Sequence, residues 1–208
     1  MARAIAVVLL ALALAGCQAP GSAQRLTRAR PPDPTDGIAA IPACPSGIVA
    51  ELNTGVRVAF AGAAADHPET CLRRIHGQTY RYYLGFWGDG TFSGGDRAER
   101  AAIRRVLIGP VGTSAEAPLA GAGPLALWHS VTFTHVGDPT LTLDGVSHPT
   151  LLVRVERHTD TGRGVRTETL WWLDRATLIP LQREEVIPTA RGHEHQLAWR
   201  VRALTAAE

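Results

Sequence analysis

The chain has 208 residues, enough for one domain of ordinary size with a substantial hydrophobic core. Its 21 basic and 19 acidic residues give a formal net charge of +2, so no strong field favours nucleic acid as a partner. Because the chain also contains no nucleic-acid-binding motif, we expect no nucleic-acid function.

Residues 1–16 have the organisation of a bacterial signal peptide. Arg3 supplies a positive charge ahead of an apolar stretch at residues 4–13. That stretch is shorter than the roughly 20 apolar residues that cross a bilayer. Small residues then lead to Cys17. The pattern predicts export, with residues 1–16 removed.

The four residues Leu14-Ala15-Gly16-Cys17 resemble the lipobox of bacterial lipoproteins. The resemblance implies cleavage before Cys17, a diacylglycerol on its thiol and a further acyl chain, such as palmitate, on its amine. Two or more acyl chains give stable membrane attachment. Gln18, in the place where Asp favours the inner membrane, implies the outer membrane facing the periplasm. The alternative is an ordinary secretory signal with a chance Cys17.

Residues 18–43 combine Pro, Gly, Ser and Arg without periodicity, which is typical of a flexible tether. We therefore expect the lipidated Cys and its tether at residues 17–43 and a single β-rich domain at residues 44–205. Cys44 and Cys71 remain after Cys17 is lipidated. An oxidising compartment favours a disulfide between them, and two buried free thiols are the alternative.

The first half of the domain shows strand patterns. Residues 56–61 alternate apolar and polar side chains, and residues 63–70 are expected to form a loop. Residues 72–87 are rich in aromatic side chains and predict one long strand or a hairpin bent at Gly77. The side chains that share one face there, by a period of two, form either the core or an aromatic-lined binding face. They are Tyr80, Tyr82, Leu84 and Phe86.

Residues 96–108 predict the one amphipathic helix. Asp96 and Glu99 resemble a capping box, and Gly109-Pro110 is typical of a helix stop. The apolar stripe consists of Ala98, Ala102, Ile103, Val106 and Leu107. The Pro- and Gly-rich residues 110–124 are expected to form a long loop, which is either functional or loosely ordered.

The second half predicts strands at residues 125–136, 140–143 and 195–203, with a turn at Asp144-Gly145. Residues 151–187 predict a meander of three strands with a hairpin loop at residues 159–164. These elements predict a mainly β (α+β) fold. It is a curved antiparallel sheet or half-barrel of about eight strands, with the helix filling its concave face.

Residues 172–184 resemble a strand–turn–strand unit of periplasmic half-barrel proteins, the LolA/LolB-like lipoprotein carriers and receptors and related envelope proteins. The resemblance implies a curved sheet around a helical plug, and some relatives shelter acyl chains there. This chain has fewer predicted helices than those carriers. We expect the apolar ligand face to comprise Tyr80, Tyr82, Phe86, Val153, Val155, Trp199 and Val201.

The segment His193-Glu194-His195 is the one cluster that resembles a ligand set. On a strand, His193 and His195 share a face and could bind a metal with a third ligand. The HExxH zinc motif is absent because Leu197 holds its fifth position. The other interpretation of the segment is a polar hairpin end. The eight histidines and the long loop motivate the alternative function, a small periplasmic hydrolase or metalloenzyme.

The patterns together favour an envelope-anchored lipoprotein that acts as a non-enzymatic binding or structural module. We expect no cofactor and no tightly bound metal. The expected partners are the membrane, through the lipid anchor, and an apolar or lipid ligand or another envelope protein.

Overall fold

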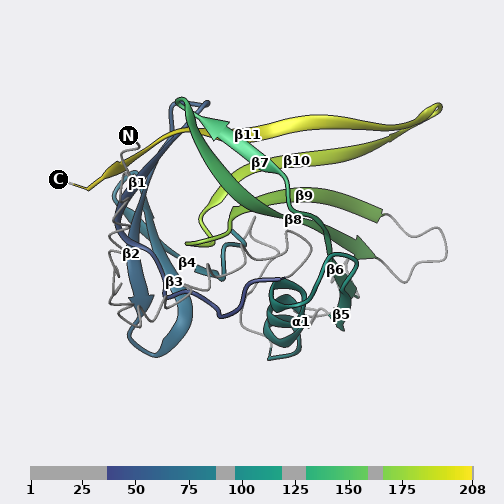
Figure 1. The fold of residues 1–208 in the computed structure, drawn as a ribbon, viewed down its shortest axis with the longest axis horizontal. Helices are drawn as coiled ribbons and strands as arrows, with labels where there is room; N and C mark the ends of the chain where they lie inside the picture. The colour runs from purple at the N-terminus through teal and green to yellow at the C-terminus, as the bar shows by residue number, and fades with distance from the viewer. Residues whose placement is uncertain (1–36, 88–96, 119–129, 159–165, 208) are drawn as a thin grey trace, which may run out of the picture. The chain divides into compact units, whose positions relative to one another are not determined.

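The computed structural model describes residues 37–87, 97–118, 130–158 and 166–207 (Figure 1). These residues form one α-helix and eleven β-strands, so the mainly β class is confirmed and the strand number exceeds the eight expected. The helix is α1 (Arg97–Ile108). The strands are β1 (Ser46–Leu52), β2 (Arg57–Ala64), β3 (His67–Ile75), β4 (Gln78–Tyr83), β5 (Ser114–Pro118), β6 (Ser130–Gly137), β7 (Thr140–Leu143), β8 (Val146–His158), β9 (Arg166–Asp174), β10 (Pro180–Thr189) and β11 (Gly192–Ala206).

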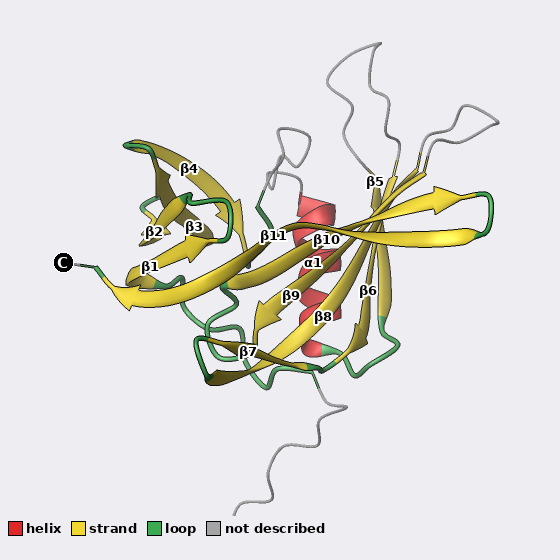
Figure 2. Ribbon diagram, turned by 90° about the horizontal axis from the view of Figure 1, so that it is seen from above, coloured by secondary structure: helices red, strands yellow, loops and turns green. Residues whose placement is uncertain are grey.

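The strands build one curved antiparallel sheet in the order β4-β3-β2-β1-β11-β10-β9-β8-β6-β5, with β7 paired to β8 (Figure 2). Strand β11 connects the two sides of this sheet. Its first part pairs with β10 as far as Arg200, opposite Gln182, and its last part pairs with β1 from Val201, opposite Leu52. The long final strand thereby joins the group β1–β4 to the group β5–β10.

Asn53 stabilises the point where β11 changes partner. The Asn53 backbone N–H donates to the Arg200 carbonyl at 2.8 Å, and the Arg200 N–H donates to Asn53 Oδ1 at 2.9 Å. The register of the β1–β11 pair shifts at the neighbouring residues Glu51 and Leu52. A side-chain oxygen therefore satisfies a backbone donor where the regular ladder is interrupted.

Helix α1 packs beside β5 and β6 and fills the interior of the sheet (Figure 1). Four predicted stripe residues are at most 5% exposed: Ala102, Ile103, Val106 and Leu107. Ala98, expected in the stripe, is exposed, and Glu99 is buried instead. The reason is the helical period, since positions 99, 102, 103, 106 and 107 follow the i, i+3, i+4 spacing of one face. One core cluster unites the helix with both sides of β11, for example Val58 and Phe133.

Three expectations about strands were wrong. Strand β1 was not expected. Residues 63–70 were expected to form a loop and belong largely to β2 and β3. Strand β5 lies inside the expected loop at residues 110–124. Small side chains explain β5, because Ala115 and Ala117 give a weak hydrophobic signal although Ala117 is fully buried against β6. The remaining expectations for residues 88–96, 119–129 and 159–165, including the cap at Asp96, lie outside the described residues.

Two turns follow their sequence signals. The aromatic segment is a hairpin, in which β3 and β4 are joined through His76 and Gly77, both with positive φ. Asp144 and Gly145 also have positive φ and join β7 to β8, as predicted. Consecutive positive φ values match the twist of antiparallel hairpins and favour Gly at the second position.

The N-terminal side of the domain is attached by a disulfide and by packing. The expected Cys44–Cys71 disulfide is present, with an S–S distance of 2.01 Å, and links the segment before β1 to β3. Ile38, in the expected tether, is 6% exposed, and its N–H donates to the Leu107 carbonyl at 3.0 Å. No helix among the described residues is long and apolar enough to cross a membrane.

Candidate functional site

The residues of the predicted apolar ligand face divide into two groups. Tyr80 is 41% exposed, and Trp199 is partly buried at the edge of the core. The other five are at most 3% exposed and belong to the core: Tyr82, Phe86, Val153, Val155 and Val201. The surface that a ligand can reach from solvent is therefore near Tyr80 and Trp199.

Tyr80 and Trp199 belong to a group that we call the aromatic–arginine cluster: Arg73, Tyr80, Tyr82, Trp87 and Trp199. In the β3–β4 pair, Arg73 lies opposite Tyr80. Arg73, Tyr80 and Tyr82 therefore share one face of the sheet. Trp87 follows the turn after β4, and Trp199 comes from β11. Four segments of the chain contribute to this cluster.

The Arg73 guanidinium lies over two aromatic rings of the cluster. Its central carbon lies 4.4 Å from the Trp87 ring centroid and 5.7 Å from that of Tyr80. Trp87 is stacked on Trp199, with centroids 4.7 Å apart and planes 19° apart. Trp199 in turn contacts Trp171 edge to face at 5.9 Å. Cation–π contacts thus stabilise Arg73, and the stacked indoles fix its position.

In the part of the chain that the structure describes, the cluster contains a buried cation, Arg73, and no carboxylate. Burial lowers the pKa of Arg73 to about 10, so its guanidinium stays charged at neutral pH. Burial also raises the pKa of Tyr82, an effect that the nearby Arg73 charge partly opposes. Among the described residues, no side chain forms an ion pair with Arg73.

Three buried polar atoms of the cluster have no hydrogen-bond partner among the described residues: Arg73 Nε, Tyr82 Oη and Trp87 Nε1. The guanidinium and indole N–H groups can only donate, and the phenol can donate as well. A buried polar group without a partner costs about 1–3 kcal/mol. The cluster can therefore accept an oxygen-rich group that the described residues do not supply.

Sequence reasoning missed Arg73 and Trp87, although both lie in the aromatic segment 72–87. The sequence did contain a signal for Arg73. Because Arg73 follows Cys71 by two residues, the two side chains share a strand face, and the predicted hairpin places that face beside Tyr80.

A separate feature is an open groove of about 1440 Å³ beside α1. Residues 37–44 line it together with Ala63, Pro68 and Ile108, so its walls are mainly apolar. Glu69 accepts a hydrogen bond from the Tyr83 hydroxyl at 2.6 Å and pairs with Arg104 of the helix. The groove therefore combines an apolar wall with an ion pair that is already formed.

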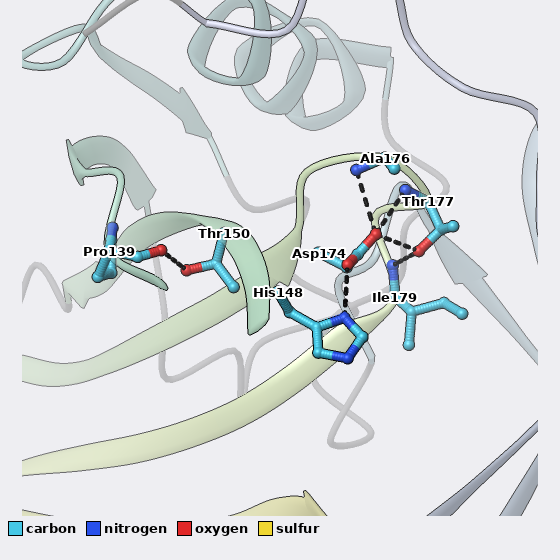
Figure 3. Close-up of polar contacts among 7 residues, drawn as sticks. All are labelled: Pro139, His148, Thr150, Asp174, Ala176, Thr177 and Ile179. Carbon is cyan, nitrogen blue, oxygen red and sulfur yellow. Dashed lines mark hydrogen bonds and ion pairs between the residues drawn. The ribbon is translucent and has the colours of Figure 1, made fainter. Parts of the chain in front are cut away.

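His148 forms the first of three histidine–carboxylate pairs among the described residues, with its Nδ1 3.2 Å from Asp174 Oδ2 (Figure 3). Asp174 Oδ1 accepts three further hydrogen bonds, from Ala176 N at 3.1 Å, Thr177 N at 2.9 Å and Thr177 Oγ1 at 2.8 Å. Beside this pair, Thr150 Oγ1 donates to the Pro139 carbonyl at 2.6 Å. The contacts of Asp174 hold the β9–β10 turn together and attach it to His148 of β8, which is a structural role for His148.

His135 forms the second pair, between the end of α1 and the β6–β7 turn. Its Nδ1 lies 3.0 Å from the Gly109 carbonyl and its Nε2 lies 2.8 Å from Asp138 Oδ1. Arg175 also contacts Asp138 Oδ1 at 2.9 Å and donates to the Gly37 carbonyl at 3.2 Å. Both ring nitrogens of this fully buried histidine are therefore used in holding elements together.

The candidate metal ligands His193 and His195 lie on the exposed first part of β11. His195 Nδ1 is 3.2 Å from Glu184 Oε2, the third histidine–carboxylate pair, and His193 lies opposite Pro188. In the described ranges, the structure places no group of three or more His, Cys, Asp or Glu residues where it could hold a metal ion.

Comparison with known proteins identifies a lipoprotein among the similar solved structures. No family model matches the chain, and no curated protein matches it. The crystal structure of the hypothetical lipoprotein YmcC from Escherichia coli (K12) is similar, with 17% sequence identity and a TM-score of 0.42. That similarity covers 79% of this chain and 91% of the other. The function proposed below rests on the residues of this chain alone.

Proposed function

We propose that the chain is a lipoprotein of the bacterial envelope whose domain is a non-enzymatic binding module. The anchor is Cys17, supported by the Leu14-Ala15-Gly16-Cys17 run behind the apolar residues 4–13. Acyl chains on Cys17 insert into the outer membrane, and the tether holds the domain in the periplasm. The Cys44–Cys71 disulfide is compatible with this oxidising compartment.

The observation that carries the binding role is the aromatic–arginine cluster. It combines the exposed ring of Tyr80 and the partly exposed ring of Trp199 with buried donors that have no described partner. Apolar rings with a few polar groups beside them are typical of ligand sites. The apolar ligand lies against Tyr80 and Trp199, because Val153 and Val155 are buried in the core cluster that also contains the helix residues.

The enzymatic alternative has weaker support. His135 uses both ring nitrogens in structural contacts, and the carboxylate that holds His148 also holds a turn. A general base needs a ring nitrogen directed at a reacting group. The contacts of these two histidines favour stabilising roles.

The anchor is tested by growing cells with an alkyne analogue of palmitate and detecting the label on the protein. Wild type should be labelled, and Cys17→Ser should not, because the acylated sulfur is absent. Equal labelling of the two proteins would overturn the lipoprotein assignment.

The binding site is tested with full-length protein in lipid nanodiscs and a fluorescent fatty-acid analogue. Trp199→Ala removes a ring of the cluster and should weaken binding by about tenfold. Trp172→Ala is the matched control, because Trp172 belongs to a separate small cluster with Leu170 and Val186. Binding that is equally affected by both variants, or no binding by wild type, would refute this site.

A further inference from the structure

We infer that the aromatic–arginine cluster recognises a carboxylate, which is the acidic group of a ligand whose apolar part lies against Tyr80 and Trp199. The inference rests on the proposed binding function and goes beyond it, because it names the ionic group and the residues that hold it. Those residues are Arg73, Tyr82 and Trp87.

The first argument is the chemistry of the unpaired atoms. Arg73, Tyr82 and Trp87 are 8%, 3% and 7% exposed, so water gives these groups little compensation. Their atoms without a described partner are Nε, Oη and Nε1, two obligatory donors and one hydroxyl. The Arg73 and Trp87 nitrogens cannot accept a hydrogen bond. The three donors therefore cannot all find acceptors within the cluster. An oxygen anion is the complementary partner.

The second argument is charge. Arg73 is the cation of the cluster that has no described carboxylate partner, whereas the neighbouring Arg81 pairs with Asp66 at 2.7 Å. A single buried positive charge is neutralised by a monoanion. A dianionic phosphate would leave a net negative charge in a site with little solvent, which is unfavourable. A carboxylate therefore fits the charge better than a phosphate.

The third argument is orientation. The guanidinium packs on the face of Trp87 at 4.4 Å, and Trp87 is itself fixed by stacking on Trp199. A guanidinium held through its face keeps its N–H edges available for a bidentate contact with a carboxylate. The stacked rings thus hold the Arg73 guanidinium in place before a ligand arrives, which reduces the entropy lost on binding. Burial removes solvent from the Arg73 cation, and this loss of solvent lowers its pKa. The same loss of solvent favours a bound anion beside the cation.

The experiment compares charged and neutral probes on full-length protein in nanodiscs, by isothermal titration calorimetry. Phenylacetate and decanoate carry the carboxylate on an aryl or an alkyl group, and phenylacetamide and decanamide are their neutral counterparts. We expect at least one carboxylate to bind about tenfold more tightly than its amide. The tighter carboxylate shows whether the apolar part of the ligand is aryl or alkyl.

Three variants assign the preference to the cluster. Arg73→Met keeps much of the side-chain volume without the charge and should abolish the preference for the carboxylate. Arg81→Met removes one positive charge from the exposed ion pair with Asp66 and should retain the preference. Trp87→Phe keeps an aromatic ring but removes the indole N–H and should weaken carboxylate binding several-fold. Thermal unfolding shows that each variant is folded before binding is measured.

The outcomes separate this inference from the proposed function. Equal binding of acid and amide would leave the binding module intact and overturn carboxylate recognition. Binding of neither probe by wild type would count against both. A preference that persists in Arg73→Met, or tighter binding of phenyl phosphate than of phenylacetate, would overturn the inference as stated.

Discussion

Asp174 provides the sharpest test of how the β9–β10 turn is held. Its side chain is 11% exposed, and one carboxylate oxygen accepts three hydrogen bonds within the turn while the other contacts His148 (Figure 3). Replacing it by Ala removes all four contacts and leaves the N–H groups of Ala176 and Thr177 without their acceptor. The structure therefore predicts that Asp174→Ala is strongly destabilising.

The expected loss follows from these contacts. Each hydrogen bond contributes about 1 kcal/mol, so the three in the turn contribute about 3 kcal/mol. The contact with His148, which is partly exposed, adds at most about 1 kcal/mol. We expect the free energy of unfolding of Asp174→Ala to fall by about 3–4 kcal/mol, a large part of the stability of an ordinary domain.

Two further variants divide this loss between the two oxygens. Asp174→Asn keeps an acceptor oxygen for the turn and loses the negative charge, so we expect a loss of about 1 kcal/mol. His148→Ala removes only the single contact to Oδ2 and should also cost about 1 kcal/mol. Urea unfolding followed by Trp fluorescence measures each free energy. A loss below about 1 kcal/mol for Asp174→Ala, or equal losses for Ala and Asn, would refute this account of the turn.

The remaining predictions concern alkaline pH and the disulfide. Burial raises the pKa of Tyr82 and Tyr83, so the folded protein keeps protons that the unfolded chain releases near pH ~10, and stability should fall above that pH. Arg73, whose pKa burial lowers to about 10, offsets part of this fall because the folded protein releases its proton first. The variant Tyr80→Phe retains Tyr82 and Tyr83 as its two tyrosines. On titration to alkaline pH, its tyrosinate absorbance should rise only as the protein unfolds. A rise while the protein is still folded would contradict the raised pKa values. Replacing both cysteines of the disulfide by Ser should lower the free energy of unfolding by about 3–4 kcal/mol in urea; an unchanged midpoint would refute this.

Local chemistry in the sequence predicted the helix, two turns and the disulfide. The period of Ala102, Ile103, Val106 and Leu107 indicates a helix face whatever lies against it, and Asp144-Gly145 favours a tight turn by its own backbone preferences. Strand β5 was missed because Ala and Ser side chains carry little hydrophobic signal. Its strand form depends on pairing with β6, which is a non-local interaction.

Only the tertiary structure determined the candidate site. Strand β11 changes its partner from β10 to β1 at Arg200, and this places Trp199 beside Trp87, which follows β4 far earlier in the chain. The same arrangement places the Arg73 guanidinium on the Trp87 ring. No periodicity in the sequence predicts these contacts, because they depend on the order of strands in the sheet. The stacking of Trp87 on Trp199 and the surroundings of Arg73 result from the strand order, and no single segment of the sequence determines them.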